Sequence, residues 1–197
     1  MSERANGYGY TVHIQIIVGS VREGRSAKPV ADWVYQQAAS RTDCSVELVD
    51  LKDWNLPLFS IGKPPILGEY EDALQQRWAQ KVAQADGYLF VSPEYNHGYT
   101  PVLKNALDYL YAEWVRKPAS FVTYGGVSGA RGVEQLRLVL VELQMAPIRD
   151  ALHISRIPSK LNDGVFTGDS RDEKQLNGVL DELLWWSSAL GNARRGG

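Results

Sequence analysis

Short apolar runs typical of β-strands alternate five times along this chain with amphipathic stretches typical of helices. No other feature constrains the fold as strongly, because such alternation favours a parallel sheet with helices on both faces and right-handed crossovers. The predicted strands cover residues 12–18, 45–51, 87–91, 118–124 and 147–154, and the predicted helices cover residues 27–39, 69–85, 100–115, 131–144 and 172–190. We therefore expect an α/β fold with a doubly wound parallel sheet.

The length of 197 residues suits one large domain with a substantial core better than two small domains. The segments 55–68 and 158–170 are interpreted as long loops, because neither separates two self-sufficient sets of strands. We expect a single domain over residues 1–197, with flexible ends at about residues 1–10 and 191–197.

The charge balance and the cysteine content narrow the function classes. A net charge of −2 gives no general reason to expect binding to nucleic acid or to an anionic membrane. Cys44 is the only cysteine, which excludes an intrachain disulfide framework and a multi-cysteine metal site. Residues 1–10 lack the apolar core of an export signal, and no run approaches the roughly 20 apolar residues of a membrane span. We expect a cytoplasmic protein.

The loops after the first, third and fourth predicted strands should meet at one edge of the sheet, where open α/β sheets bind ligands. The first loop, residues 19–28, carries Ser20, Arg22, Arg25 and Ser26 just before a predicted helix. Backbone N–H groups and the helix dipole favour an anion there, and arginine adds paired hydrogen bonds to phosphate oxygens. The loop matches neither a Walker loop nor a Gly-x-Gly-x-x-Gly fingerprint, and it suits one terminal phosphate. A solvated loop with Ser26 as an ordinary helix cap is the alternative.

The loop after the third strand has a composition that suits a planar, polar heterocycle. It runs Ser92-Pro93-Glu94-Tyr95-Asn96-His97-Gly98. Pro93 restricts the backbone so that it can lie along a ring edge, Tyr95 can cover a ring face, and Asn96 can both donate and accept hydrogen bonds. The ionised side chain of Glu94 can only accept hydrogen bonds, so it suits a structural role or contact with a substrate better than contact with ring carbonyls. His97 could touch the ligand or a bound nicotinamide, but its chemistry alone favours a solvent-exposed loop histidine, and nothing requires it as a base.

The loop after the fourth strand begins with Tyr124-Gly125-Gly126. Glycines let the backbone approach a flat ligand closely and adopt positive φ. A flexible strand-to-helix turn would explain these glycines by themselves. Their expected convergence with the third-strand loop favours contact with a ligand.

Other constellations give weaker signals. His13, His97 and His153 are far apart in sequence, so a metal site is not expected. Ser20 lies outside any Gly-x-Ser-x-Gly elbow, which disfavours a hydrolase. The apolar series in residues 136–143 lies on a predicted helix and can serve the core on one side and a subunit interface on the other.

Taken together, the motifs resemble the NADPH-dependent FMN reductase family of flavodoxin-like quinone, azo and FMN reductases. In the order of the family they are Gly19-Ser20-Val21-Arg22, Ser92-Pro93-Glu94-Tyr95-Asn96, Leu103-Lys104-Asn105-Ala106-Leu107-Asp108 and Tyr124-Gly125-Gly126. The resemblance covers about residues 12–190. It implies a flavodoxin-like, doubly wound, five-stranded parallel sheet in the order 2-1-3-4-5 with helices on both faces.

The resemblance also implies a binding site for FMN. The phosphate would be held by Ser20, Arg22 and Ser26, with Arg25 as a helper. The isoalloxazine ring and ribityl chain would lie along Pro93, Glu94, Tyr95, Asn96 and His97, and the third contact would come from Tyr124, Gly125 and Gly126. Lys104, Asn105 and Asp108 would hold the loop and helix. The resemblance implies no catalytic side chain, because the flavin carries the chemistry, and no metal.

The activity implied by the resemblance is two-electron, ping-pong transfer from NADPH, or NADH, through N5 of FMN to an acceptor such as a quinone, an azo compound or free flavin. A homodimer, or a tetramer, is implied as well. One alternative is a non-enzymatic flavin protein, either a one-electron carrier or a redox-responsive partner module. A nucleotide-binding module without flavin is a further alternative.

Overall fold

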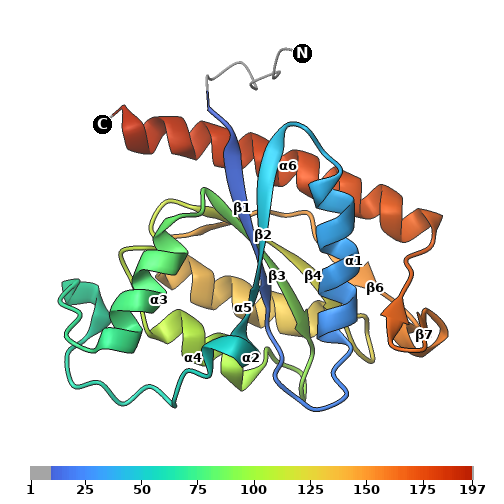
Figure 1. The fold of residues 1–197 in the computed structure, drawn as a ribbon, viewed down its shortest axis with the longest axis horizontal. Coiled ribbons are helices and arrows are strands. Elements are labelled where there is room, and N and C mark those ends of the chain that lie inside the picture. The colour runs from blue at the N-terminus through green and yellow to red at the C-terminus, as the bar shows by residue number, and fades with distance from the viewer. Residues whose placement is uncertain (1–9, 197) are drawn as a thin grey trace.

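The computed structural model describes residues 10–196, so the expected flexibility of residues 1–9 and of residue 197 lies outside the described residues. Its sheet has the order β2-β1-β3-β4-β5, with β6 also paired to β4, and all of these pairings are parallel. The strands are β1 (Val12–Val18), β2 (Cys44–Asp50), β3 (Gly87–Pro93), β4 (Pro118–Tyr124), β5 (Ala146–Pro147) and β6 (Leu152–Ile154). Figure 1 shows the chain from β1 to the long C-terminal helix, and the predicted strand order is confirmed.

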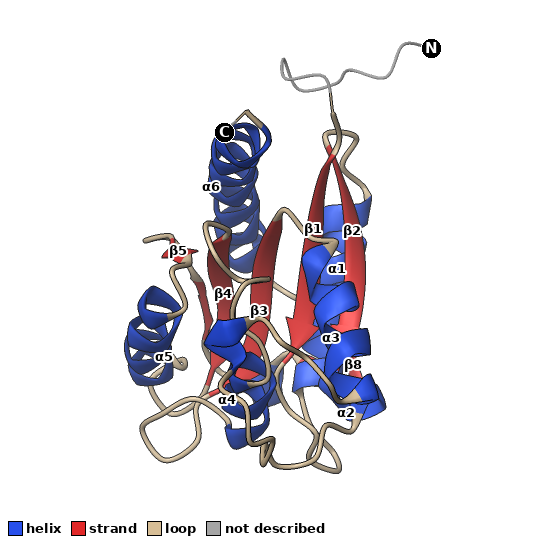
Figure 2. Ribbon diagram, turned by 90° about the vertical axis from the view of Figure 1, so that its left-hand side faces the viewer, coloured by secondary structure: helices blue, strands red, loops and turns tan. Residues whose placement is uncertain are grey.

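Helices cover both faces of the sheet, as the alternating pattern predicts. One face packs against α1 (Ala27–Ala39) and α6 (Ser170–Arg195), and the other packs against α3 (Ala73–Ala83), α4 (Pro101–Asp108) and α5 (Ala130–Glu142). Alternate residues of β1 serve the two sides: Ile16 joins the core with α1 and α6, and Ile17 joins the core with α3 and α4. Figure 2 shows β1, β2, β3 and β4 side by side among these helices.

The fifth predicted strand, residues 147–154, is interrupted in its middle. Pairing to β4 occurs only at Ala146–Pro147 and again at Leu152–Ile154. Between the two pieces, the guanidinium of Arg137 donates to the carbonyl oxygens of Pro147, Ile148 and Arg149, at 3.3, 2.5 and 2.8 Å. A side chain from α5 thus satisfies backbone groups that a continuous strand would have paired in the sheet.

Two of the predicted helices are shorter than expected, and a side-chain cap accounts for one of them. The helix expected from residue 69 begins at Ala73, because the side chain of Asp72 accepts from the backbone N–H of Gln75 at 2.8 Å. The helix expected over residues 100–115 ends at Asp108 and continues as turns. Asp50 ends β2 and caps the short helix α2 (Leu51–Trp54), which the sequence pattern did not predict.

The segment 158–170, predicted to be a loop, contains the short helix η2 (Ile157–Ser159) at its start and then a small hairpin. Its strands are β7 (Leu161–Asn162) and β8 (Val165–Phe166), which pair in antiparallel fashion. The connecting Asp163 and Gly164 both have positive φ, 48° and 80°. An Asp-Gly pair between apolar residues is a hairpin signal that was present in the sequence. The segment 55–68 is mostly irregular, as expected, with one helical turn, η1 (Pro65–Leu67).

The C-terminal end is more ordered than predicted. The helix α6 continues to Arg195, although residues from 191 onward were expected to be flexible. Arg194 donates to the backbone carbonyl of Arg116 at 2.5 Å and forms an ion pair with Asp86 at 3.3 Å. The guanidinium of Arg195 lies 3.5 Å from the centre of the Tyr10 ring. These contacts hold the last turn of the helix against the rest of the domain.

Trp114 is buried in the core, whereas Trp185 on α6 is exposed. On α5, Leu136 and Leu140 are buried and Leu138 is exposed, which fits one core side and one outer side. No helix within residues 10–196 is long and apolar enough to cross a membrane. No group of three or more potential metal ligands gathers within the same residues.

Lys117 is a buried lysine whose positive charge destabilises the folded state. Its ammonium donates to the carbonyls of Val82 and Ala83 and to the hydroxyl of Tyr88, at 3.3, 3.1 and 3.1 Å. Burial, reinforced by Arg194, lowers the pKa of Lys117 from 10.5 to about 8. Below the lower pKa both folded and unfolded states are protonated, and the folded state bears the cost of the buried charge. Between the two pKa values only the unfolded state stays protonated, so raising the pH favours folding.

We expect the stability difference between wild type and Lys117→Met to shift in favour of wild type by about 1 to 2 kcal/mol from about pH 7.5 to 9.5. Urea denaturation of both proteins at the two pH values measures this shift. The variant serves as the reference for every other group that titrates in the range. A difference that stays constant with pH would contradict a depressed lysine pKa.

Candidate active site

The loops after β1, β3 and β4 meet at the carboxyl ends of these strands, as the sequence predicts. They enclose a cavity of about 80 Å³. Its lining consists of Ser20, Arg22, Gly24, Arg25, Ser26, Pro93, Tyr95 and Tyr124. Seven of these eight residues are predicted site residues, and Gly24 is the one that sequence reasoning missed. The cavity has room for a group about the size of a phosphate, so the remainder of a nucleotide would lie outside it.

The first loop is held close to the third strand by contacts around Gly19. A Cβ atom on Gly19 would come within 3.2 Å of the Cβ of Ser92, which leaves little space for any larger residue. The backbone N–H of Gly19 donates to Val91 at 2.8 Å, and the hydroxyl of Thr100 donates to the carbonyl of Gly19 at 2.6 Å. Thr100 also caps α4 and so couples the first loop to the helix after the third loop. This role was not predicted from the sequence.

The two arginines of the first loop have different surroundings. Arg25 is largely buried and forms a bidentate ion pair with Asp50, with both bonds at 2.6 Å. Arg22 is exposed, and its guanidinium lies 6.0 Å from the centre of the Tyr95 ring. Arg22 is therefore the arginine with freedom to reach a ligand in the cavity, whereas Arg25 is committed to the protein. Ser26 occupies the N-cap position of α1, but its side chain makes no capping hydrogen bond.

Two tyrosines line the cavity. The hydroxyls of Tyr95 and Ser20 lie 2.9 Å apart, which links the third loop to the first. Tyr124, at the end of β4, is almost completely buried. Burial and the neighbouring Tyr95 raise the pKa of Tyr124 well above its usual value, against the opposing effect of Arg22 and Arg25. Its hydroxyl thus remains protonated at neutral pH and can donate a hydrogen bond into the cavity.

The third loop reverses direction in a tight turn that exposes Asn96 and His97. Tyr95 and Gly98 exchange backbone hydrogen bonds of 3.0 Å in both directions. Asn96 and His97 have positive φ values of 49° and 74°, as in a type I′ turn. The side chain of Gln135 on α5 donates to the carbonyl of His97 at 2.7 Å. The turn therefore presents an amide and an imidazole at the surface beside the cavity.

His97 stands where a type I′ turn favours glycine, so its backbone is strained. We expect His97→Gly to stabilise the protein by about 0.5 to 1 kcal/mol, because glycine adopts this φ without the steric penalty. His97→Ala is the matched control, since it removes the ring but keeps the Cβ atom. Thermal or urea unfolding of the three proteins gives the comparison. Equal stabilisation by both variants would assign the effect to the ring instead of the backbone.

The carboxylate of Glu94 is directed to α5 instead of the cavity. It forms an ion pair with Arg131 and accepts from the backbone N–H groups of Arg131 and Gly132, at 3.2 and 3.4 Å. Only 3% of its side chain is exposed. Burial works against ionisation, but the Arg131 guanidinium and these N–H groups prevail and hold the pKa of Glu94 below its usual value. The resemblance to the family places Glu94 among the residues along the flavin ring, but the carboxylate of Glu94 anchors the third loop to α5.

Gly125 and Gly126 lie exposed at the start of the fourth loop. Gly125 has a φ of 153°, and a Cβ atom there would lie 3.0 Å from that of Glu94. The space around Gly126 is open. Near the end of β4, the hydroxyl of Thr123 donates to the carbonyl of Ser128 at 3.0 Å and lies 3.0 Å from Nδ1 of His153. These contacts shape the fourth loop, in which Gly125 lies against Glu94 at the start of the third loop.

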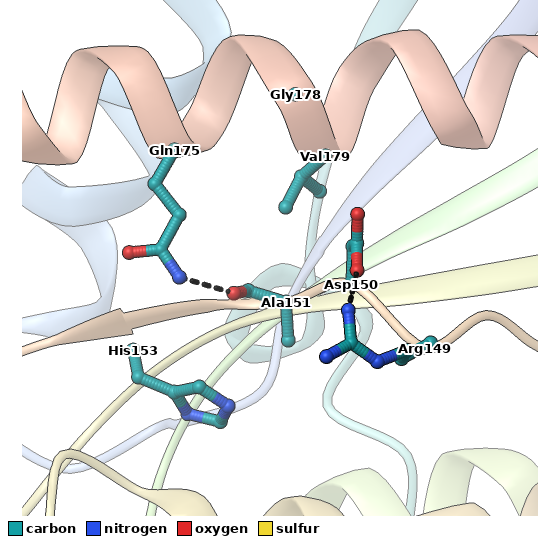
Figure 3. A pocket seen from close by; sticks show the side chains of 7 residues that line it. All are labelled: Arg149, Asp150, Ala151, His153, Gln175, Gly178 and Val179. Atoms are coloured by element: carbon teal, nitrogen blue, oxygen red, sulfur yellow. Dashed lines mark hydrogen bonds and ion pairs between the residues drawn. The ribbon is translucent and has the colours of Figure 1, made fainter.

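A larger cavity of about 450 Å³ lies between the segment before β6 and helix α6 (Figure 3). It is lined by Arg149, Asp150, Ala151, His153, Gln175, Gly178 and Val179. Its polar groups bind one another: Gln175 donates to the carbonyl of Ala151 at 2.8 Å, and Arg149 pairs with Asp150 at 3.1 Å. None of the predicted site residues lines it, and the three converging loops do not form it.

Three residues on α4, to which the resemblance gives the role of holding the loop and helix, make local contacts. The side chain of Asn105 accepts from the backbone N–H of Phe59 and donates to the carbonyl of Pro57, both at 2.8 Å. Lys104 and Asp108 form an ion pair one turn apart along the helix. Asn105 thereby fastens the irregular 55–68 segment next to the third loop.

Comparison with known proteins finds consistent relatives. The family model described as NADPH-dependent FMN reductase matches residues 12–158. An NAD(P)H-dependent FMN reductase of Schizosaccharomyces pombe is 35% identical over 189 residues, covering 94% of this chain and 86% of the relative. A 2-hydroxy-1,4-benzoquinone reductase of a Burkholderia species is 30% identical over 183 residues, covering 88% of this chain and 94% of the relative. The solved structure of FerB, a flavoenzyme NAD(P)H:(acceptor) oxidoreductase from Paracoccus denitrificans, aligns with a TM-score of 0.70 at 23% identity, covering 91% of this chain and 98% of FerB.

Proposed function

This chain belongs to the NADPH-dependent FMN reductase family, and we propose that it transfers two electrons from NAD(P)H, by way of bound FMN, to a small acceptor such as a quinone, an azo compound or free flavin. The chain is accordingly an oxidoreductase with FMN as cofactor and NAD(P)H as co-substrate. The observation that carries the proposal is the small cavity where the loops after β1, β3 and β4 meet.

The donors around this cavity suit the phosphate of FMN. Ser20, Ser26 and Tyr124 contribute hydroxyls, and Arg22 contributes a guanidinium with freedom to move. The cavity lies next to the start of α1, where backbone N–H groups and the helix dipole favour an anion. Its volume of about 80 Å³ admits one phosphate group and leaves the ring outside. Outside, the Tyr95–Gly98 turn and Gly125–Gly126 offer backbone and side-chain hydrogen-bonding groups for a flat heterocycle.

In this assignment the protein binds and orients, and bound FMN supplies the capacity to accept and pass on two electrons. Arg22 and the hydroxyls would hold the phosphate end. Asn96 would hydrogen-bond the ring edge, and the backbone at Gly125 would lie against it. Because Asn96 and His97 are exposed, NAD(P)H and the acceptor would reach the same open face in turn, which predicts ping-pong kinetics.

We also propose that the protein forms a homodimer, or a dimer of dimers. Two exposed apolar residues on α5, Leu138 and Val141, and the exposed Leu58 beside α4 support this assembly, because large apolar side chains on a surface favour burial against a partner. Sedimentation velocity on the purified protein measures the state. A monomer across the accessible concentration range would contradict the assembly.

The activity is tested by adding FMN to the purified protein, removing the excess, and recording the visible spectrum. We expect a yellow protein whose colour is bleached by NADPH without oxygen and restored by a quinone. A protein that retains no flavin would contradict the proposed cofactor site. A protein that retains FMN but is not reduced by NADPH or NADH would instead support the non-enzymatic alternative.

A further inference from the structure

Asp50 lies outside the lining of the cavity, yet its carboxylate organises the loop that forms it. It is the last residue of β2 and is buried. Each of its oxygens accepts a hydrogen bond of 2.6 Å from a different terminal nitrogen of Arg25. Oδ1 also accepts from the backbone N–H of Lys52 at 3.0 Å, which caps α2. The carboxylate therefore ties the edge strand of the sheet to the loop after β1.

Arg25 passes this connection on to the cavity. The same terminal nitrogen that contacts Oδ1 of Asp50 donates to the backbone carbonyl of Ser20 at 2.5 Å. The hydroxyl of Ser20 in turn lies 2.9 Å from the hydroxyl of Tyr95. A continuous series of hydrogen bonds thus runs from β2, through Arg25 and Ser20, to the third loop.

The first loop needs such an anchor because its tip has little other support. Val21, Arg22, Glu23 and Gly24 are all exposed, and Gly24 has a φ of 62°. The backbone of Arg25 closes the tip with one hydrogen bond of 3.3 Å to Arg22. The planar guanidinium of Arg25 binds both the carbonyl of Ser20 and the carboxylate of Asp50. This fixed geometry would not be reproduced by an ammonium group.

We propose that Asp50 is a positioning residue for the cofactor phosphate, acting through Arg25 to preorganise the first loop. This role rests on the FMN site proposed above. An anchored loop loses less conformational freedom when the phosphate binds, so its donors bind more tightly. Asp50 itself does not touch the ligand. Its removal should therefore weaken the contribution of the FMN phosphate to binding and leave the contribution of the ring unchanged.

Simple electrostatics predicts the opposite sign. A carboxylate near a phosphate opposes its binding, so removal of the negative charge of Asp50 would strengthen FMN binding and free Arg25 to contact the phosphate. Positioning predicts weaker binding on the same substitution. The direction of the change therefore separates the two accounts.

The experiment measures dissociation constants for FMN and riboflavin with the flavin-free full-length protein, by quenching of flavin fluorescence. Riboflavin lacks the phosphate, so the ratio of the two constants isolates the phosphate contribution. Asp50→Asn keeps the side-chain shape and remains a good helix cap. We expect it to weaken FMN binding by about 10-fold while riboflavin binding changes less than about 2-fold.

Arg25→Lys provides the second variant, because it keeps the charge but loses the planar fork. We expect the same selective loss of FMN binding, and no further loss when the two substitutions are combined. Tighter FMN binding by Asp50→Asn, or equal losses for FMN and riboflavin, would overturn the positioning role. If the wild-type protein binds FMN and riboflavin equally well, the phosphate site itself is contradicted. Both the proposed function and the positioning role of Asp50 then fail.

Discussion

Replacing Arg22 with alanine is expected to weaken FMN binding by about 10- to 100-fold and to leave the fold intact. Arg22 is the exposed arginine at the cavity, and charge-assisted hydrogen bonds to a phosphate are each worth about 1.5 to 3 kcal/mol. Its side chain forms no ion pair within the described residues, so its removal should cost the flavin-free protein little stability. Titration with FMN and riboflavin, followed by fluorescence quenching, measures the loss.

Arg149→Ala is the matched control, because it removes the same charge from an exposed site that the three loops do not form. We expect Arg149→Ala to bind FMN like the wild type. If both variants lose affinity equally, a general effect of charge is responsible. If neither does, the phosphate contact of Arg22 is wrong, and the hydroxyls of the cavity must carry the phosphate without it.

Replacing Glu94 with glutamine is expected to destabilise the protein by about 1 to 3 kcal/mol at neutral pH and to lower its retention of FMN. The buried carboxylate both pairs with Arg131 and caps α5, and glutamine can replace neither the charge nor both acceptor oxygens. The loss should fall below that for a fully buried pair, because Arg131 is partly exposed and can be rehydrated. Urea denaturation and the flavin-to-protein absorbance ratio measure the two effects.

The stability difference between wild type and Glu94→Gln should depend on pH in a defined direction. The pKa of Glu94 is lower in the folded protein than its ordinary value of 4.5. The contribution of the ionised carboxylate is therefore fully present above 4.5 and is lost as the pH falls through the lower, folded-state pKa. We expect the two proteins to converge in stability in strong acid. Glu142→Gln, an exposed position at the end of the same helix, should change stability by less than about 0.5 kcal/mol at any pH.

Much of the fold could be predicted because its determinants are local. The apolar run of β1 and the spacing of buried residues in α1 give both elements at the boundaries observed, 12–18 and 27–39. The split of the fifth strand could not be predicted in this way. It depends on Arg137 of α5 reaching the carbonyls of residues 147–149, a contact made only once helix and strand are packed together.

The candidate site shows the same division. The order of strands and loops, with a phosphate-type loop after the first strand and a glycine pair after the fourth, is encoded in neighbouring residues and is sufficient to predict where the site lies. The sequence could not show that Arg25 is paired with Asp50, or that the carboxylate of Glu94 is directed to α5. Those outcomes depend on partners far along the chain, Asp50 and Arg131, which only the parallel sheet and its crossovers bring within hydrogen-bonding distance. The sequence by itself determined the fold and the place of the site, and tertiary packing decided which charged side chains remain available to a ligand.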